Sequence, residues 1–320
     1  MHMKIVVLDG HAVNPGDLSW DIMKQFGQVE VYDYTAPEQT IQRLQGADIA
    51  LTNKTILDKA VLDACPSVKL ICVLATGYNV VDCEDTKRRG IPVCNVPAYG
   101  TDAVAQFTFA LLLELCHQVG HHSKAVHDGR WCNNRDFCFW DTPQMELAGK
   151  TMGIIGFGKI GRAVGKIAKV MGMKVIAYNR SQCDEGAAIG EYVSLETLLK
   201  TADVVSLHCP LTAKNAGLIN KETLAQMKDG AILLNTARGP LLDEQAVADA
   251  LATGKLRGAA VDVVSREPME RTNPLLTATN CIITPHMAWA PTESRQRILD
   301  CTARSVAAFL EGKPINTVNM

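Results

Sequence analysis

Short apolar runs alternate with amphipathic segments along the first hundred residues. The runs are rich in Val, Ile and Leu and predict buried strands at residues 4–8, 29–32, 48–51 and 70–74. Segments with helical spacing lie between them, at residues 17–26, 37–44 and 57–65. Such alternation is typical of a parallel sheet with helices on both faces.

The same alternation returns after a long apolar segment and an aromatic-rich loop. A helix is expected from residue 101 to about residue 125, and the loop with its aromatic residues spans residues 131–140. Further strands are predicted at residues 151–155, 174–178, 204–207, 231–235, 259–262 and 281–284. A final helix is predicted at residues 293–310 with no strand after it, so we expect it to pack on the first half of the chain.

The strand predicted at residues 151–155 ends in the pattern G-x-G-x-x-G, formed by Gly156, Gly158 and Gly161. A helical segment follows at once, which is the context that makes the pattern informative. The first glycine permits a tight turn, the second lets a pyrophosphate approach the backbone, and the third brings helix and strand close together. The helix N-terminus then offers N–H groups and partial positive charge to phosphates. The pattern predicts a dinucleotide site.

The end of the next strand bears on the choice of dinucleotide. An acidic residue usually binds the adenosine ribose of NAD about 20 residues past the glycines, but this chain has Asn179 followed by Arg180. The missing carboxylate and the neighbouring guanidinium favour tolerance of, or preference for, NADP(H). The alternative is that Arg180 points to solvent and Asn179 binds the ribose of NAD(H) without a charge.

These patterns predict an α/β protein of two doubly wound parallel-sheet domains. A Rossmann cofactor domain of residues 100–287 is expected to be inserted into a flavodoxin-like substrate domain of residues 1–99 and 288–320. A length of 320 residues and a hydrophobic content of 47 % suit two domains, each with its own core.

Composition argues against several classes of protein. The formal net charge of −2 and the pI of about 6.4 give no basic surplus for nucleic acid. No apolar run has the length of a membrane span, and the N-terminus enters a strand without the layout of a signal peptide. The 11 cysteines are then expected to be free thiols in a reducing cytoplasm. The Cys and His spacings match no common zinc motif, so no metal is predicted.

Three strand ends carry the residues that reduction of a carbonyl group by hydride requires. Arg238, Glu267 and His286 each come shortly after a predicted strand of the second sheet. Histidine is suited to give the proton, a carboxylate behind it fixes its tautomer, and an arginine binds the carboxylate of a 2-oxo acid. Each residue alone is more often structural, but together, downstream of the glycine pattern, they favour catalysis.

The chain resembles the D-isomer-specific 2-hydroxyacid dehydrogenase family over nearly its whole length. The resemblance rests on ATGYN at residues 75–79, the glycine pattern, the strand end at Arg238, the Glu267-Pro268 step and the Thr284-Pro285-His286 step. Within the family, the phrases LTNK at 51–54, FCFWDTP at 137–143 and HMAWA at 286–290 are most similar to glycerate dehydrogenases, also called hydroxypyruvate reductases.

The resemblance implies a role for each matching residue. His286 is the expected acid/base, Glu267 its partner and Arg238 the substrate anchor. The expected cofactor-binding residues are Gly156, Gly158, Lys159, Ile160, Gly161, Asn179, Arg180, His208, Cys209, Pro210, Thr236, Ala237 and Asp262, the last on the nicotinamide side. Backbone N–H groups of Thr76 and Gly77 are expected to bind the substrate carboxylate.

Two further substrate-binding residues are implied less directly. Lys54 either selects substrate or is a surface lysine, and Trp140 either reaches a partner's active site or is an interface aromatic. The segment of residues 101–145 resembles the family's dimerisation arm, so a homodimer is expected.

The expected function is therefore NAD(P)-dependent oxidation and reduction of a small D-2-hydroxy acid and its 2-oxo acid, with hydroxypyruvate and glycerate favoured. The alternatives are a D-lactate dehydrogenase, a short phosphoglycerate dehydrogenase, and a cofactor-sensing binding protein like the corepressors built on this fold. No added regulatory domain is expected after residues 316–320, and this expectation argues against the longer phosphoglycerate enzymes.

Overall fold

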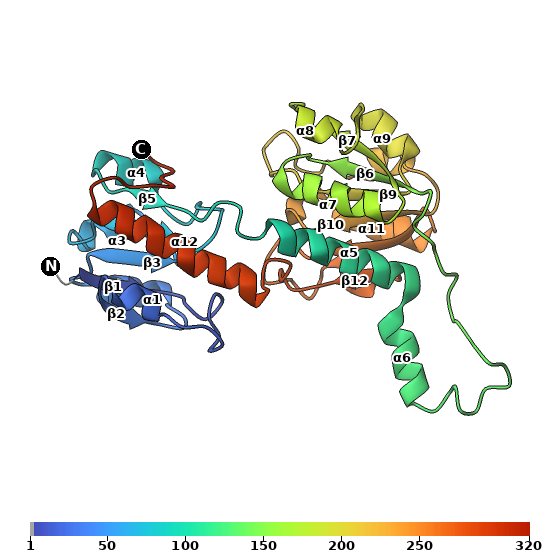
Figure 1. The fold of residues 1–320 in the computed structure, drawn as a ribbon, viewed down its shortest axis with the longest axis horizontal. Helices are drawn as coiled ribbons and strands as arrows, with labels where there is room; N and C mark the ends of the chain where they lie inside the picture. The colour runs from blue at the N-terminus through green and yellow to red at the C-terminus, as the bar shows by residue number, and fades with distance from the viewer. Residues whose placement is uncertain (1–2) are drawn as a thin grey trace. The chain divides into compact units, whose positions relative to one another are not determined.

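The computed structural model describes residues 3–320, which divide into two compact units (Figure 1). Unit 1 is formed by the chain up to Gly100 together with Trp289–Met320, and unit 2 by Thr101–Ala288. Each unit has its own parallel sheet, and the chain passes from unit 1 to unit 2 and back once.

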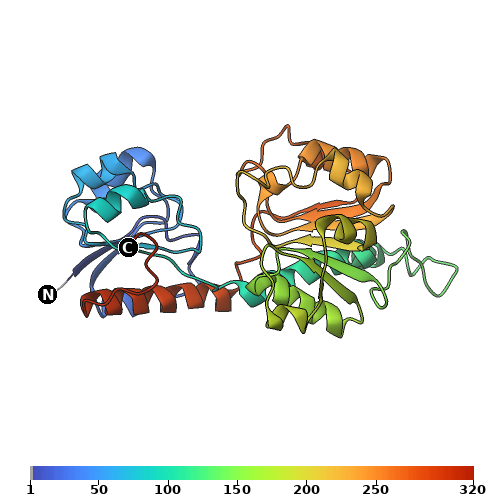
Figure 2. The ribbon, with the colours of Figure 1, turned by 90° about the horizontal axis from the view of Figure 1, so that it is seen from above.

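Unit 1 contains a five-stranded sheet in the order β2-β1-β3-β4-β5. Its strands are β1 (Met3–Val7), β2 (Gly27–Val31), β3 (Ile49–Thr52), β4 (Leu70–Val73) and β5 (Val93–Cys94). Its helices are α1 (Asp21–Lys24), α2 (Thr40–Leu44), α3 (Lys59–Ala64), α4 (Cys83–Arg88) and α12 (Thr292–Leu310). Helices lie on both faces of this sheet (Figure 2).

Alternate residues of the unit 1 strands serve two separate cores. Ile5 and Val7 of β1 pack in a cluster with Ile298 and Leu299 of α12, whereas Val6 packs in a second cluster with residues of α2 and α3. Because side chains of a strand point alternately to its two faces, a strand buried on both faces is apolar throughout. The unbroken apolar runs of the sequence follow from this arrangement.

Unit 2 contains a seven-stranded sheet in the order β12-β11-β10-β9-β6-β7-β8. Its strands are β6 (Thr151–Ile155), β7 (Lys174–Tyr178), β8 (Glu191–Tyr192), β9 (Val204–Leu207), β10 (Ala231–Asn235), β11 (Leu256–Val261) and β12 (Cys281–Ile283). Its helices are α5 (Thr101–His117), α6 (Val119–His127), α7 (Lys159–Val170), α8 (Asp184–Ala187), α9 (Leu195–Thr201), α10 (Lys221–Gln226) and α11 (Glu244–Ala252). The order of strands reverses between β6 and β9, which makes their carboxyl ends the expected ligand site of this sheet.

Two predicted helices differ from those of the structure. The helix expected at residues 17–26 is reduced to α1, of four residues. The helix expected to run from residue 101 to about 125 ends at His117, because Gln118 adopts a left-handed conformation with φ 47° and α6 starts anew after it. His117 and His121, which are four residues apart in the sequence, therefore lie on different helices.

The chain from α6 to residue 146 extends from the body of unit 2 as an arm (Figure 1), and Leu147 is again buried in the core of the unit. Asp141 holds the arm's two limbs together: its carboxylate lies 2.5 Å from His121 Nε2 and 2.7 Å from Arg130 Nη1. The guanidinium of Arg130 and then His121 hold the pKa of Asp141 well below its usual range. The arm therefore has a defined conformation of its own although α6 has no buried residue.

Within residues 3–320, no single helix is long and apolar enough to cross a membrane. The bent pair α5 and α6 reaches the required length and composition only when its two helices are taken together.

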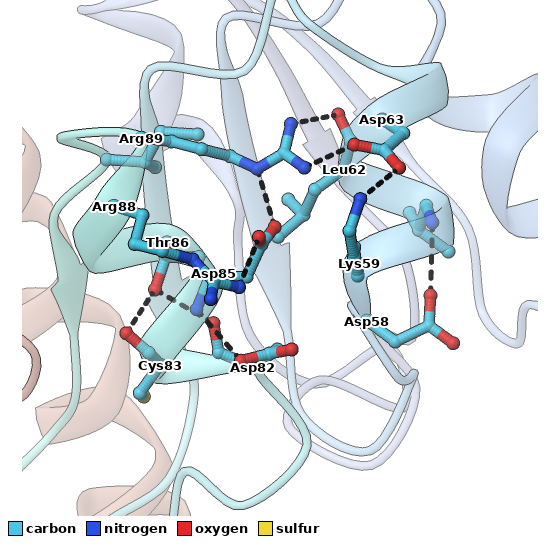
Figure 3. A network of polar contacts seen from close by, with 12 residues as sticks. Asp58, Lys59, Leu62, Asp63, Asp82, Cys83, Asp85, Thr86, Arg88 and Arg89 are labelled. Atoms are coloured by element: carbon cyan, nitrogen blue, oxygen red, sulfur yellow. Dashed lines mark hydrogen bonds and ion pairs between the residues drawn. The ribbon is translucent and has the colours of Figure 1, made fainter.

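A network of charges joins α3 to α4 in unit 1 (Figure 3). The Asp85 carboxylate, 5 % exposed, lies 2.5 Å from Arg89 Nε and 2.9 Å from Arg88 Nη2. Arg89 also pairs with Asp63 and donates to the Leu62 carbonyl, so one guanidinium connects the two helices. The hydrogen bond from Arg89 is the main reason that the pKa of Asp85 is lowered.

We predict that Arg89→Met lowers the melting temperature of the protein by several degrees at pH 7, because it leaves Asp85 with a single, exposed partner. A carboxyl group whose pKa is lowered by folding stabilises the fold above its ordinary value of 3.8, and this contribution is lost as the pH falls through the lowered value. The difference from wild type should therefore shrink below about pH 4. Lys59→Met, which removes only an exposed ion pair with Asp63, is the control; equal losses for both variants would contradict the prediction.

Candidate active site

The glycine pattern forms a turn between β6 and α7 that has the shape required by a dinucleotide. Gly156 has φ +94°, and a β-carbon there would lie 2.4 Å from Cys209 N. A β-carbon at Gly161 would lie 2.1 Å from the Gly156 carbonyl oxygen. At Gly158, in contrast, a β-carbon would meet open space. The two outer glycines allow the close packing of the turn, and the middle one leaves its outer side free for a ligand to approach.

Helix α7 begins directly after this turn with its first N–H groups uncapped by any side chain. Its N-cap is Gly158, and its first turn contains Lys159 and Ile160 with no acidic residue. An uncapped N-terminus with partial positive charge suits a pyrophosphate. The residues present therefore fit a dinucleotide cofactor.

Asn179 closes the end of β7 against the glycine turn. Its Oδ1 accepts a hydrogen bond from Phe157 N at 3.0 Å, and its Nδ2 donates to the Ser181 carbonyl. Both ends of the side-chain amide are thus engaged by the backbone. Arg180 and Ser181 are exposed beside it, and Arg180 has no ion-pair partner within residues 3–320.

His208 lies after β9, on the opposite side of the switch point from Asn179. Its N–H donates to the Ile155 carbonyl at 2.7 Å, and its Nε2 lies 2.8 Å from Ser206 Oγ. Burial lowers the pKa of His208 to about 3, so the imidazole stays neutral at ordinary pH. Cys209 and Pro210 continue this strand end, where Cys209 N lies close to Gly156. The strand end that carries these three residues thus lies next to the glycine turn. Their contact with the cofactor stays a prediction.

Arg238 lies on a tight turn at the end of β10. The buried side chain of Asn235 closes that turn, accepting from Ala237 N at 3.0 Å and donating to the Arg238 carbonyl at 2.9 Å. Thr236 Oγ1 lies 3.1 Å from Thr108 Oγ1 of α5. A β-carbon at Gly239 would lie 1.9 Å from the Val264 carbonyl carbon, so this glycine lets the turn contact the loop that leads to Glu267.

His286 and Glu267 form a hydrogen-bonded pair in unit 2. His286 Nδ1 lies 2.7 Å from Glu267 Oε2, and the other carboxylate oxygen accepts from Val264 N at 3.3 Å. The two side chains are 35 % and 38 % exposed, so both reach the surface of the unit. A proton on Nδ1 is held by the carboxylate, which leaves Nε2 to exchange a proton with a ligand.

Asp262 fixes the backbone around His286. Its buried carboxylate accepts hydrogen bonds from Thr284 Oγ1 at 2.6 Å and from the N–H groups of Met287 and Ala288 at 2.9 Å each. Its backbone carbonyl accepts from His286 N at 2.8 Å. These four bonds hold His286 in a left-handed conformation with φ 52°, which is costly for a residue other than glycine. The structure thus shows that the Asp262 carboxylate is hydrogen-bonded to the loop after β12. Its contact with the cofactor stays a prediction.

The remaining predicted site residues are exposed. Thr76 and Gly77 follow β4, and Thr76 Oγ1 donates to the Val96 carbonyl at 2.8 Å. Lys54 follows β3 in the same sheet, and Trp140, 64 % exposed, is part of the arm. Each lies in a loop at a strand end or in the arm, and each role stays a prediction.

The sequence analysis assigned no role to several residues that support the site through hydrogen bonds and close packing. Asn235 and Gly239 shape the turn of Arg238, and Thr284 contacts Asp262. Asn235 could have been found from the sequence, because it is a short polar residue at the end of a buried apolar strand. Contacts between segments about twenty residues apart, such as Thr284 with Asp262, have no comparable signal in the sequence.

The sequence matches the profile of the NAD binding domain of D-isomer-specific 2-hydroxyacid dehydrogenases over residues 109–288. It is 53 % identical to a hydroxypyruvate reductase of Blautia hydrogenotrophica, over 99 % of this chain and 100 % of that protein. The chain belongs to the D-isomer-specific 2-hydroxyacid dehydrogenase family. A glycerate dehydrogenase of Methylorubrum extorquens is 38 % identical over 99 % of both chains.

A solved relative has the same fold as this dehydrogenase. The D-lactate dehydrogenase of Aquifex aeolicus, complexed with NAD and lactic acid, aligns with a TM-score of 0.83 and 30 % identity over 99 % of both chains. The predicted pair of parallel-sheet α/β domains with a Rossmann fold is confirmed. The protein is an oxidoreductase that acts on the CH–OH group of D-2-hydroxy acids with a nicotinamide cofactor.

We predict that Asp262→Ala lowers kcat on the order of a hundredfold, because loss of the three side-chain hydrogen bonds to Thr284, Met287 and Ala288 misplaces His286. Turnover and melting temperature are measured together. Asp203→Ala is the matched control, since Asp203 also accepts a backbone N–H, from Thr151 at 2.8 Å, but does so before β9, at the far end of the sheet. A fall in melting temperature with unchanged kcat in Asp262→Ala would show that the side-chain hydrogen bonds of Asp262 serve stability alone.

Proposed function

We propose that this dehydrogenase interconverts hydroxypyruvate and D-glycerate. The observation that carries the proposal is the His286–Glu267 pair beside the Arg238 turn, in a chain 53 % identical over its length to a hydroxypyruvate reductase. The resemblance of LTNK and FCFWDTP to glycerate dehydrogenases supports the same substrate. A bound nicotinamide cofactor would supply or take the hydride at C2.

The residues of the chain act on the substrate's oxygen atoms. His286 Nε2 gives a proton to the carbonyl oxygen during reduction and takes it back during oxidation, while Glu267 holds Nδ1. Arg238 binds the substrate carboxylate and stabilises charge that develops on the carbonyl oxygen. The N–H groups of Thr76 and Gly77 are further donors to the carboxylate. All of these assignments are part of the proposal.

Cofactor contacts follow the glycine turn in this proposal. Gly156, Gly158, Lys159, Ile160 and Gly161 bind the pyrophosphate, and His208, Cys209 and Pro210 line the adenosine side. Thr236, Ala237 and Asp262 would contact the nicotinamide side of the bound cofactor.

NADP(H) is the dinucleotide that we propose for this site. Position 179 is Asn, so no carboxylate is present there to bind the 2′-hydroxyl or repel a 2′-phosphate. Both polar ends of the Asn179 side chain are bound to the backbone. Arg180, the next residue, is exposed, and its guanidinium has no ion-pair partner within residues 3–320. A 2′-phosphate would therefore meet a cation and no opposing charge.

A homodimer in the cytoplasm is the assembly and location that we propose. The arm exposes large apolar side chains to a degree that is unusual for a monomer: Val119 63 %, Trp131 52 %, Phe137 88 % and Trp140 64 %. A second copy of the chain is the partner, with Trp140 near the substrate of that copy.

The first test is oxidation of NADPH and NADH by the purified protein with hydroxypyruvate, glyoxylate and pyruvate. Hydroxypyruvate should give the highest kcat/KM. His286→Ala should lower kcat by about 10² to 10⁴-fold, since the proton donor is lost, and should keep its affinity for the cofactor. Near wild-type turnover in His286→Ala would refute the assigned role, and a preference for pyruvate would refute the proposed substrate.

The preference between cofactors is tested by Arg180→Ala and Asn179→Asp. Arg180→Ala should raise KM for NADPH by about tenfold, the loss of one charge-assisted contact, and leave KM for NADH nearly unchanged. Asn179→Asp should weaken NADPH binding through repulsion. Equal effects on both cofactors would mean that Arg180 does not contact a 2′-phosphate.

The dimer is tested by sedimentation of the wild type and Phe137→Glu. The wild type should sediment as a dimer and the variant as a monomer, because a carboxylate would be buried in the interface. Glu146→Gln, a conservative change in the same arm, should stay dimeric. A monomeric wild type would refute the proposal.

A further inference from the structure

In unit 1, one carboxylate holds the loop after β3. Asp9 follows β1, and its two oxygens accept hydrogen bonds from three successive backbone N–H groups, those of Asn53 at 2.7 Å, Lys54 at 2.5 Å and Thr55 at 2.8 Å. β1 and β3 are neighbours in the sheet, and the order of strands reverses between them. Asp9 thus fixes the loop at the switch point of the unit 1 sheet, where an open α/β sheet binds ligands.

The fixed loop presents Lys54 to a pocket of about 400 Å³ that lies within unit 1. Asn53 is buried, whereas Lys54 beside it is exposed and has no ion-pair partner within residues 3–320. Tyr34 and Ile56, which are 69 % and 63 % exposed, form part of the apolar lining. The pocket therefore offers one exposed ammonium donor beside apolar surface.

The charges of the lining limit what the pocket can take. Lys54 is its one basic lining residue, and Asp9 and Asp58 also line it. An uncharged hydroxyl group can accept from the Lys54 ammonium without meeting repulsion. A phosphate group with two negative charges would face two carboxylates against a single cation, which is unfavourable.

We propose that Asp9 is the positioning residue for substrate selection by Lys54. Through the three N–H groups it sets the ammonium to bind the uncharged oxygen substituent at C3 of the substrate. This inference rests on the proposed function, in which that substituent is the hydroxyl group of hydroxypyruvate. The enzyme then prefers a 2-oxo acid with a hydroxyl group at C3 over one that has only hydrogen at C3, such as pyruvate, or one with a phosphate at C3.

Asp9→Asn is the sharpest variant, because it keeps the size of the side chain and changes only its hydrogen bonding. One carboxylate oxygen becomes an NH₂ group, which faces N–H donors and cannot accept from them. We expect KM for hydroxypyruvate to rise about tenfold, in the range for a lost substrate contact. The kcat, KM for pyruvate and affinity for the cofactor should stay near wild type.

Lys54→Met should show the same loss of selectivity, and the double variant Asp9→Asn/Lys54→Met should be no worse than Lys54→Met alone. That non-additivity is the readout that a merely structural role would not move. Asp48→Asn is the matched control: Asp48 also accepts a backbone N–H, from Lys4 at 2.9 Å, but it precedes β3 at the other end of the sheet. It should change stability and leave the ratio of kcat/KM between hydroxypyruvate and pyruvate unchanged.

The outcomes separate this inference from the proposed function. If the wild type prefers hydroxypyruvate and Asp9→Asn keeps that preference, or if the double variant is additive, the role of Asp9 is refuted and the proposed function stands. If the wild type shows no preference for hydroxypyruvate, both fall. Efficient reduction of 3-phosphohydroxypyruvate by the wild type would overturn the charge argument for the pocket.

Discussion

The hydrogen bonds between Asp262 and the loop after β12 are the constraint on which the proposed chemistry of this enzyme depends. A histidine in a loop after a strand would ordinarily change its position whenever the loop changes conformation. Here the loop is tied to a buried carboxylate on the neighbouring strand end, and His286 is kept in a left-handed conformation that the chain would not otherwise favour. Glu267 then has only to orient a ring whose backbone is already in place.

Unit 1 uses the same physical device in its own sheet. Asp9 accepts three N–H groups from the loop after the adjacent strand, as Asp262 accepts its donors from the loop after β12. In a parallel sheet the backbone groups just beyond the strand ends have lost their ladder partners, and burying them unpaired is costly. A strand-end aspartate satisfies several at once, and so turns an otherwise free loop into a fixed support for side chains.

The sequence predicts the long buried strands better than the short edge strands β5 and β8, the shorter helices and the loops. Strands such as β9 and β10 lie at their predicted residues because burial on both faces makes them apolar without interruption. The break at Gln118 was not predictable, since a glutamine with φ 47° lacks the glycine that usually marks such a position. The same difference holds within the site. The glycine turn and the strand-end Arg, Glu and His can be predicted from sequence patterns. Asp9, in contrast, accepts hydrogen bonds from backbone N–H groups 44 to 46 residues away, and such contacts leave no periodic pattern in the sequence.

Chemistry and selectivity have different physical supports in this chain. The residues around His286 and the turn of Arg238 are held by short hydrogen bonds and by glycines with no room for a β-carbon. Lys54 and Arg180, the residues proposed to select substrate and cofactor, are exposed cations on loops whose backbones are fixed while their own charged ends are unpaired within residues 3–320. A substitution at either cation therefore leaves the supports of the reacting groups untouched, so that selectivity can change without loss of the reaction itself.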